Sequence, residues 1–298
     1  MRRILVPLDG SDLSTSILDD AIRLAGPDGT LLLVQEVRRV SGRAAAMHDP
    51  VFDTEEARQY LNGVAEGLRS RGISVATTVR TTFHVAEAID EAARANEVDM
   101  IACATHSRGA IGSILWGSVA WKVVTQSPVP VMLRHPALNN GRMTTSSGQR
   151  RILVPLDGSP LAEKALPLAQ ELTAEWAAPI DVVLVVPRLR AEAERGPMEE
   201  YLTRIVGSLA GEAQGHVMIG DPVEELIAFA RGAGTTEVVM SPHGRAGLAR
   251  VFLGSVAYDL VHRLPIPVIL TPALETQHGQ SEKIPVNVET TPVASSKE

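Results

Sequence analysis

The feature that most constrains the fold is an internal repeat. The nine residues RILVPLDGS at 3–11 recur unchanged at 151–159, an offset of 148. Two later pairs, WGSVA at 116–120 with LGSVA at 253–257 and PVPV at 128–131 with PIPV at 265–268, are offset by 137. The first copy therefore holds 11 more residues, which we place in a surface loop near 38–60. Such a repeat indicates two copies of one structural unit.

The repeat predicts two domains, residues 1–138 and 151–274. Between them, residues 139–150 are polar and lack apolar periodicity, which is typical of a flexible linker. The polar tail at 275–298 is predicted to be disordered. With 298 residues, the chain is long enough for two domains of ordinary size.

Each copy alternates short apolar runs with amphipathic stretches of helical period. In the first copy the predicted strands are 3–8, 30–37, 75–80, 100–104 and 129–133, and the helices are 13–25, 54–70, 85–95 and 113–126. In the second copy they are strands 152–156, 181–186, 215–219, 237–241 and 266–270, and helices 162–175, 198–212, 223–233 and 250–263. Such alternation with short connections requires a parallel sheet with right-handed crossovers. The predicted fold class is α/β, with each domain a doubly wound, five-stranded parallel sheet covered by helices on both faces.

The composition excludes several classes of function. A net charge of −7 provides no basic field for nucleic acid or an anionic membrane. The sequence contains no apolar run of about 18 residues and no signal-peptide pattern at its start, so neither a membrane span nor export is predicted. Cys103 is the single cysteine and is predicted to be buried and inert. We expect a cytoplasmic protein without a metal cluster of its own.

Two junctions in each copy lie where sheets of this class bind ligands, beyond the carboxyl ends of strands at the point where strand order reverses. One follows the first strand, at Asp9 and Asp157. The other follows the fourth strand, at 104–118 and 241–255, where glycines lead into a helix. Glycines let successive N–H groups point inward, and a helix amino terminus favours anions. The second junction is therefore predicted to hold phosphate groups.

These residues resemble those of a known family. THSRGAIGSILWGS at 105–118 and PHGRAGLARVFLGS at 242–255 look like the nucleotide loop of universal stress (UspA-like) proteins, in which Gly, two residues, Gly and nine residues precede Gly-Ser or Gly-Thr. VPLDGS at the end of the first strand, Gly-Asp-Pro at 220–222 and the closing PVPV or PIPV are further landmarks. The resemblance covers both copies, so the chain is identified as a tandem, two-domain member.

The resemblance implies an adenine nucleotide α-hydrolase-like fold and a stress-response protein that binds ATP or a related adenine nucleotide, with any Mg²⁺ carried by the phosphates. It implies a regulatory binding protein and no enzyme. Carried over by position, the nucleotide contacts in the second copy are Pro155, Asp157, Val185, His243, Gly244, Arg245, Gly254, Ser255 and Val256. Those in the first copy are Pro7, Asp9, His106, Ser107, Arg108, Gly117, Ser118 and Val119. The first-copy counterpart of Val185 lies near Glu36.

The two copies depart from the loop pattern unequally. Ser241 replaces the first loop glycine of the second copy, which retains Gly244. Ala104 and Ser107 replace both loop glycines of the first copy. A Cβ where positive φ is required costs about 1 kcal/mol or more. We therefore expect the first site to bind nucleotide more weakly than the second.

Other interpretations of the junctions remain open. The Gly-Ser pairs at 117–118 and 254–255 also fit close helix–sheet packing, which would make the chain an interaction module with vestigial sites. A base at Asp157 or His243 would make it a slow nucleotide hydrolase. P-loop and serine-hydrolase motifs are absent from the sequence. His106 and its counterpart His243 fit a loop-orienting hydrogen bond, a phosphate contact or pH sensing.

The last strand of each copy is predicted to be a sheet edge. An exposed apolar edge at 129–133 or 266–270 invites pairing, and the resemblance implies dimerisation through this strand. In a tandem chain the two copies can pair with each other as an internal pseudo-dimer, and a homodimer of chains is a further option. The aromatic side chains on the preceding helices are interpreted as core or interface residues: Trp116, Trp121, Phe252 and Tyr258.

Overall fold

The computed structural model describes residues 2–38, 54–105, 118–135, 149–243 and 253–272. They fall into two compact units, the first ending at Ala102 and the second beginning at Cys103. The predicted loop at 40–50, most of the linker and the predicted tail lie outside the described residues. In the described part of the chain, no helix is long and apolar enough to cross a membrane.

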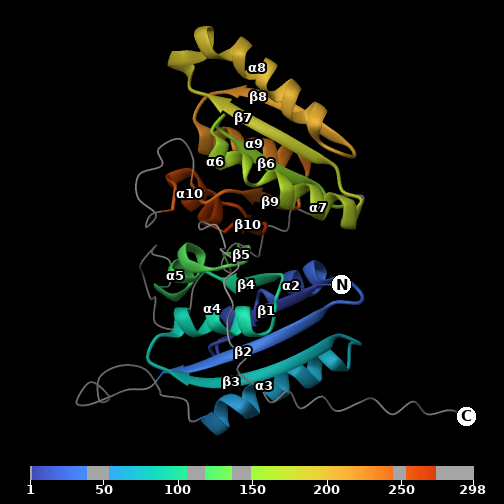
Figure 1. Cartoon of the computed structure of the whole chain (residues 1–298), viewed down its shortest axis with the longest axis vertical. Coiled ribbons are helices and arrows are strands. Elements are labelled where there is room, and N and C mark those ends of the chain that lie inside the picture. The colour runs from blue at the N-terminus through green and yellow to red at the C-terminus, as the bar shows by residue number, and fades with distance from the viewer. Residues whose placement is uncertain (1, 39–53, 106–117, 136–148, 244–252, 273–298) are drawn as a thin grey trace, which may run out of the picture. The chain divides into compact units, whose positions relative to one another are not determined.

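The first unit is a parallel sheet with the strand order β3-β2-β1-β4 (Figure 1). Its strands are β1 (Arg3–Pro7), β2 (Thr30–Arg38), β3 (Ser74–Thr82) and the start of β4 (Met100–Ala104). Helices α2 and α3 pack against β1, β2 and β3, and α4 packs against β2. The helix bounds are α1 (Asp12–Thr15), α2 (Leu18–Ala25), α3 (Thr54–Arg69) and α4 (Val85–Ala95).

The second unit has the strand order β5-β10-β9-β6-β7-β8 (Figure 1). Its strands are β5 (Val131–Arg134), β6 (Ile152–Leu156), β7 (Ile180–Val186), β8 (Ala213–Ile219), β9 (Glu237–Met240) and β10 (Val268–Leu270). The β6, β7, β8, β9 and β10 pairings are parallel, whereas β5 pairs antiparallel with β10. The helices are α5 (Ser118–Gln126), α6 (Pro160–Glu163), α7 (Leu166–Trp176), η3 (Arg188–Arg190), α8 (Ala191–Ser208), α9 (Pro222–Ala233) and α10 (Ser255–Arg263).

The central strands are buried because helices cover their sheets, and their sequences reflect this. Ile4, Leu5 and Val6 in β1 have no exposed surface, and the same is true of residues 152–154 in β6. Such strands carry continuous apolar runs without alternation, since both faces meet other elements. The predicted α/β fold class, with mainly parallel sheets, is confirmed.

The helix predicted after each first strand is broken into two pieces. In the first copy the break is at Ser16–Ile17, where the Ser16 hydroxyl donates to the Leu13 carbonyl over 2.6 Å and competes with the helix backbone. In the second copy Pro167 lies in the first turn of α7. Proline has no N–H and clashes with the carbonyl four residues earlier, which favours the break between α6 and α7. The single helices predicted at 13–25 and 162–175 were wrong.

Helix α8 also differs from its prediction of 198–212, because it begins at Ala191 and ends at Ser208. Ion pairs four residues apart, Arg190 with Glu194 and Arg195 with Glu199, support the early turns. At the other end Leu209 is extended, and Gly211 has φ +88°. Pro197, one residue before the predicted start at 198, lies inside the helix.

Candidate functional site

The strand orders place the reversal point between β1 and β4 in the first copy and between β6 and β9 in the second. Ligands of doubly wound sheets bind beyond the carboxyl ends of the strands at this point. Pro7 is the last residue of β1, and Pro155 is the last but one of β6. The predicted residues Asp9 and Asp157 follow directly. The first of the two predicted junctions therefore lies where the fold offers a ligand site.

The Asp-Gly-Ser sequence after each of these strands forms the same turn. One carboxylate oxygen of Asp9 accepts hydrogen bonds from the backbone N–H of Ser11 at 3.0 Å and from its hydroxyl at 2.5 Å. Asp157 binds Ser159 in the same way, at 2.9 and 2.6 Å. The glycine between them has φ +80° in both copies, a conformation that disfavours any side chain. Each aspartate thus has a structural role in fixing the turn.

The serine of this turn also caps the helix that follows. The Ser11 hydroxyl accepts from the N–H of Ser14, and the Ser159 hydroxyl accepts from the N–H of Ala162, both at 3.2 Å. An amino-terminal cap of this kind satisfies an N–H that the helix itself leaves unpaired. The amino termini of α1 and α6 are therefore closed by their own chain.

The amino terminus of α10, at the second junction, is arranged differently. The N–H of Gly254 donates to the carbonyl of Pro242 over 2.8 Å, which joins the two ends of the loop after β9. A Cβ on Gly254 would lie 3.3 Å from that carbonyl oxygen, so this close approach favours glycine. Ser255, the first residue of α10, is exposed, and Gly254 has no side chain with which to cap the helix. Among the described residues, the cap position therefore offers no side-chain acceptor to the first-turn N–H groups, and such groups favour an anion.

Helix α10 begins at the serine of the Gly-Ser pair, Ser255, and the described part of α5 includes the equivalent serine, Ser118. The prediction that α10 starts at 250 was wrong, because Leu253 and Gly254 are not helical. The half-buried Val119 and Val256 follow in the first turns. The remaining predicted contacts lie outside the described residues: His106, Ser107, Arg108, Gly117, Gly244 and Arg245.

His243 is the last described residue before the loop. It is half-buried, and its backbone N–H donates to the hydroxyl of Ser241 over 3.4 Å. On the following helix Tyr258 stacks on His262, with ring centroids 4.2 Å apart. That contact agrees with the interpretation of Tyr258 as a packing residue. The role of the His243 ring stays a prediction.

Strand register identifies the first-copy counterpart of Val185. Leu5 of β1 lies opposite Leu32, and the equivalent Leu153 of β6 lies opposite Asp181. Four residues further along these strands are Glu36 and Val185. Glu36 is thus the structural equivalent of Val185, and the two copies place a carboxyl group and an isopropyl group at the same position.

The Glu36 carboxyl is enclosed and weakly paired. Its side chain is 2% exposed, and neither oxygen has a hydrogen-bond partner in the part of the chain that the structure describes. The nearest cation is Arg80 of β3, at 3.9 Å, which itself donates to the Glu91 carboxylate at 2.8 Å and to the Ala88 carbonyl at 3.0 Å. Burial raises the pKa of Glu36 to about 7, against the opposing effect of Arg80. Glu36 was predicted only by its position in the chain, and neither Arg80 nor Glu91 was predicted.

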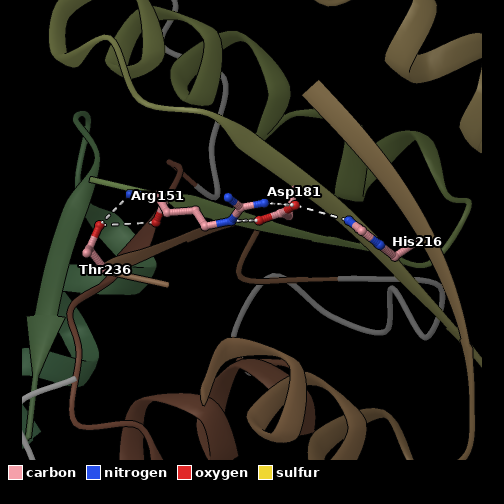
Figure 2. Close-up of polar contacts among 4 residues, drawn as sticks. All are labelled: Arg151, Asp181, His216 and Thr236. Atoms are coloured by element: carbon pink, nitrogen blue, oxygen red, sulfur yellow. Dashed lines mark hydrogen bonds and ion pairs between the residues drawn. The ribbon is translucent and has the colours of Figure 1, made fainter. Parts of the chain in front are cut away.

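A second buried charge lies in β7, away from the predicted junctions (Figure 2). Asp181 is fully buried and accepts hydrogen bonds from Arg151, at 2.5 and 2.9 Å, and its carboxylate lies 3.0 Å from Nε2 of His216. The Thr236 hydroxyl accepts from the Arg151 backbone N–H at 2.8 Å. Asp181 is the second residue of β7, so this cluster lies toward the amino ends of the strands. Sequence reasoning missed it, although an aspartate in the run IDVVLVV is a visible signal.

Among the described residues, no three or more His, Cys, Asp or Glu side chains gather as a metal site would require. Comparison with known proteins then decides the family. The model of the universal stress protein family matches residues 1–135 and 149–272. The chain belongs to this family. Its tandem organisation is visible in the two matched segments.

Curated relatives carry the same family name. A universal stress protein of Mycobacterium tuberculosis is 29% identical over 191 residues, which cover 59% of this chain and 62% of the relative. The matched region thus spans about three fifths of that relative's length. The universal stress protein E homolog of Haemophilus influenzae is 23% identical over 254 residues, covering 75% and 77% of the two chains.

Solved structures share the fold. A universal stress protein from Archaeoglobus fulgidus covers 91% of this chain and 98% of its own, with a TM-score of 0.65 at 21% identity. A putative universal stress protein from Pseudomonas aeruginosa covers 91% and 93%, with a TM-score of 0.66 at 19% identity. These likenesses extend over both copies and support the fold class.

Proposed function

We propose that this universal stress protein binds ATP or a related adenine nucleotide at the β9–α10 junction and acts as a regulatory binding protein in the stress response. The observation that carries the proposal is the amino terminus of α10. Its loop is closed by the bond from Gly254 to Pro242, and its first residue, Ser255, is exposed. The first-turn N–H groups, to which Gly254 offers no side-chain acceptor, and the helix dipole favour a phosphate there. Any Mg²⁺ would arrive with the phosphates.

Binding without rapid turnover fits the turn chemistry. One oxygen of Asp157 is held by both the N–H and the hydroxyl of Ser159. A carboxylate fixed in this way has less freedom to accept a proton from an attacking water. We therefore assign Asp157 to the shape of the site and propose no hydrolytic step.

The first copy would provide a second, weaker site at the start of α5. Its helix α5 includes the equivalent serine, Ser118, but Ala104 and Ser107 replace both loop glycines. Each position that needs positive φ costs about 1 kcal/mol with a side chain present, and 1.4 kcal/mol is tenfold in affinity. We expect two classes of site with at least a severalfold difference in affinity.

A single substitution tests the main site. Ser255→Asp places a negative charge at the first position of α10, where it favours the helix but repels phosphate. We expect calorimetric titration of nucleotide-stripped protein with ATP to show loss of the tighter site, a drop of tenfold or more. Thr203→Asp adds the same charge to an exposed position of α8 and serves as the matched control.

Two results would contradict the proposal. One is the absence of adenine nucleotide in freshly purified protein together with no binding at millimolar ATP. The other is an unchanged affinity in the Ser255→Asp variant, which would show that ATP binds elsewhere.

A further inference from the structure

The Glu36 carboxyl lies at the ligand-binding edge of the first unit. The last residue of β2 that pairs with β1 is Val34, opposite Pro7, and Glu36 lies two residues beyond it. It therefore lies in the part of β2 that extends past the carboxyl end of β1, at the edge where sheets of this class bind ligands. Position 36 as a whole is half-buried, as is Val185 in the second copy, although the Glu36 side chain itself is 2% exposed.

Two acceptor oxygens at this edge lack donors. Neither Glu36 oxygen has a hydrogen-bond partner in the structure, and Arg80, at 3.9 Å, is beyond hydrogen-bonding distance. Arg80 donates instead to Glu91 and Ala88 of α4. A buried carboxylate without donors is costly, and fold stability alone does not favour it. A ligand that brings N–H groups to this edge would recover that cost.

The second copy lacks this group and its surroundings. Strand register equates Glu36 with Val185 and Arg80 with Met218. The seventh residue of the next helix is Glu91 in α4 and Ala228 in α9. Three charged positions in the first copy are thus apolar in the second. The difference is confined to one copy, so the common fold does not require the charges.

We propose that Glu36 reads the base of the nucleotide bound by the first copy and makes that site prefer guanine, whereas Val185 leaves the second site suited to adenine. The inference rests on the proposed function, since it assigns a base to a site that must first bind nucleotide. Guanine presents two adjacent donors, its ring N–H and its amino group, which match the two oxygens of a carboxylate. Adenine presents one donor beside an acceptor, and that acceptor would face a carboxylate oxygen.

Hydrogen bonds from a base to a charged group are strong enough to distinguish guanine from adenine. Each contributes about 1.5–3 kcal/mol when its partner is otherwise unsatisfied, which corresponds to about tenfold or more in affinity. An apolar side chain such as that of Val185 offers no such selection. The two sites of one chain are therefore expected to differ in base preference as well as in affinity.

The experiment uses the full chain with the second site disabled by Ser255→Asp. At pH 8, where the Glu36 carboxyl is mainly ionised, binding of GTP and of ATP to the first site is measured by calorimetry. We expect GTP to bind about tenfold more tightly than ATP. The variant Glu36→Gln keeps the size of the side chain but offers one donor and one acceptor, the pattern that matches adenine. It should reverse the preference, and Glu36→Val should abolish it.

The reciprocal change provides an independent readout. Val185→Glu in the otherwise native chain should shift the second site from ATP toward GTP. Equal binding of GTP and ATP at the first site, or a ratio unchanged by Glu36→Gln, would overturn the inference while leaving ATP binding by the second copy intact. Absence of any nucleotide binding in the native chain would overturn the proposed function as well. Unfolding curves for each variant show whether a lost signal reflects a lost fold.

Discussion

Two buried carboxyl groups give the first unit a dependence on pH. Burial raises the pKa of Glu36 and that of Asp90 in α4 to about 7 in each case. Arg80 and Glu91 act on Glu36 with opposite signs, and Arg94 and Glu87 do the same for Asp90. In both cases desolvation is the larger effect. These groups bind a proton more tightly in the folded chain than in the unfolded one.

The first prediction follows from that linkage. Because the folded pKa of Glu36 lies above its ordinary value of 4.5, its contribution to stability is full below pH 4.5 and is lost as pH rises to about 7. The loss amounts to about 3 kcal/mol at most. The glutamine of Glu36→Gln does not titrate, so the variant should not lose this stability as pH rises. Urea unfolding should therefore show the variant gaining stability relative to the native chain between pH 5 and pH 8. Glu56→Gln, at an exposed position of α3, is the control. A change in stability that is the same at both pH values would contradict the assignment.

The partners of buried charged residues such as Glu36 and Asp181 are hard to predict from the sequence. The junctions at Asp9 and Asp157 could be located because each comes just after a continuous apolar run, which is a local signal of a buried strand. The partners of Glu36 and Asp181 could not, because Arg80 and His216 reach them from other strands through register. A charged residue in an apolar run signals that a partner exists, but the sequence does not say which residue it is.

At the scale of elements, the strands were predicted more accurately than the helix ends. Strands β4 and β6 are each five residues long, and the ranges predicted for them, 100–104 and 152–156, coincide with the structure. Helix boundaries depend instead on which group takes the last unpaired N–H or carbonyl. The Ser16 hydroxyl and the missing N–H of Pro167 each decide a break that apolar periodicity cannot show.

The carboxyl ends of α4 and α9 offer a matched pair of substitutions. Glu97 follows α4 with φ +49°, and Gly234 occupies the equivalent position after α9 with φ +68°. A side chain in this left-handed conformation costs about 1 kcal/mol relative to glycine. We therefore expect Glu97→Gly to stabilise the chain and Gly234→Ala to destabilise it by similar amounts, as measured by thermal unfolding. Both positions are solvent-accessible, so packing contributes little. Shifts of the same sign in the two variants would contradict this account.

At the scale of the whole molecule, the duplication has kept the backbone chemistry and changed the buried charges. Both copies use the same Asp-Gly-Ser turn after the first strand, with the same hydrogen bonds from the serine to the aspartate. The first copy places Glu36 where the second has Val185, and the second places Asp181 where the first has Leu32. The shared turns preserve the fold, whereas the interior charges differ between the copies and are therefore not required by it.

The last prediction concerns β5, whose pairing partner within the second unit is β10. Met132 lies directly opposite Ile269 in the antiparallel register, and both side chains are buried. Replacing both with cysteine should give, on mild oxidation, a disulfide within one chain, seen as faster migration on a non-reducing gel. The native Cys103 is buried and does not compete.

The same cross-link should raise the unfolding temperature, because it closes a long loop and restricts the unfolded chain. Its contribution to the free energy of unfolding is up to about 4 kcal/mol. Leu133→Cys with Leu270→Cys is the matched control, since these residues lie on the same two strands but oppose other partners, Val268 and Val131. Covalent dimers in place of the internal cross-link would show that β5 pairs with β10 of another chain. A disulfide within one chain that forms only between positions 132 and 269 would establish that β5 and β10 of the same chain pair with each other.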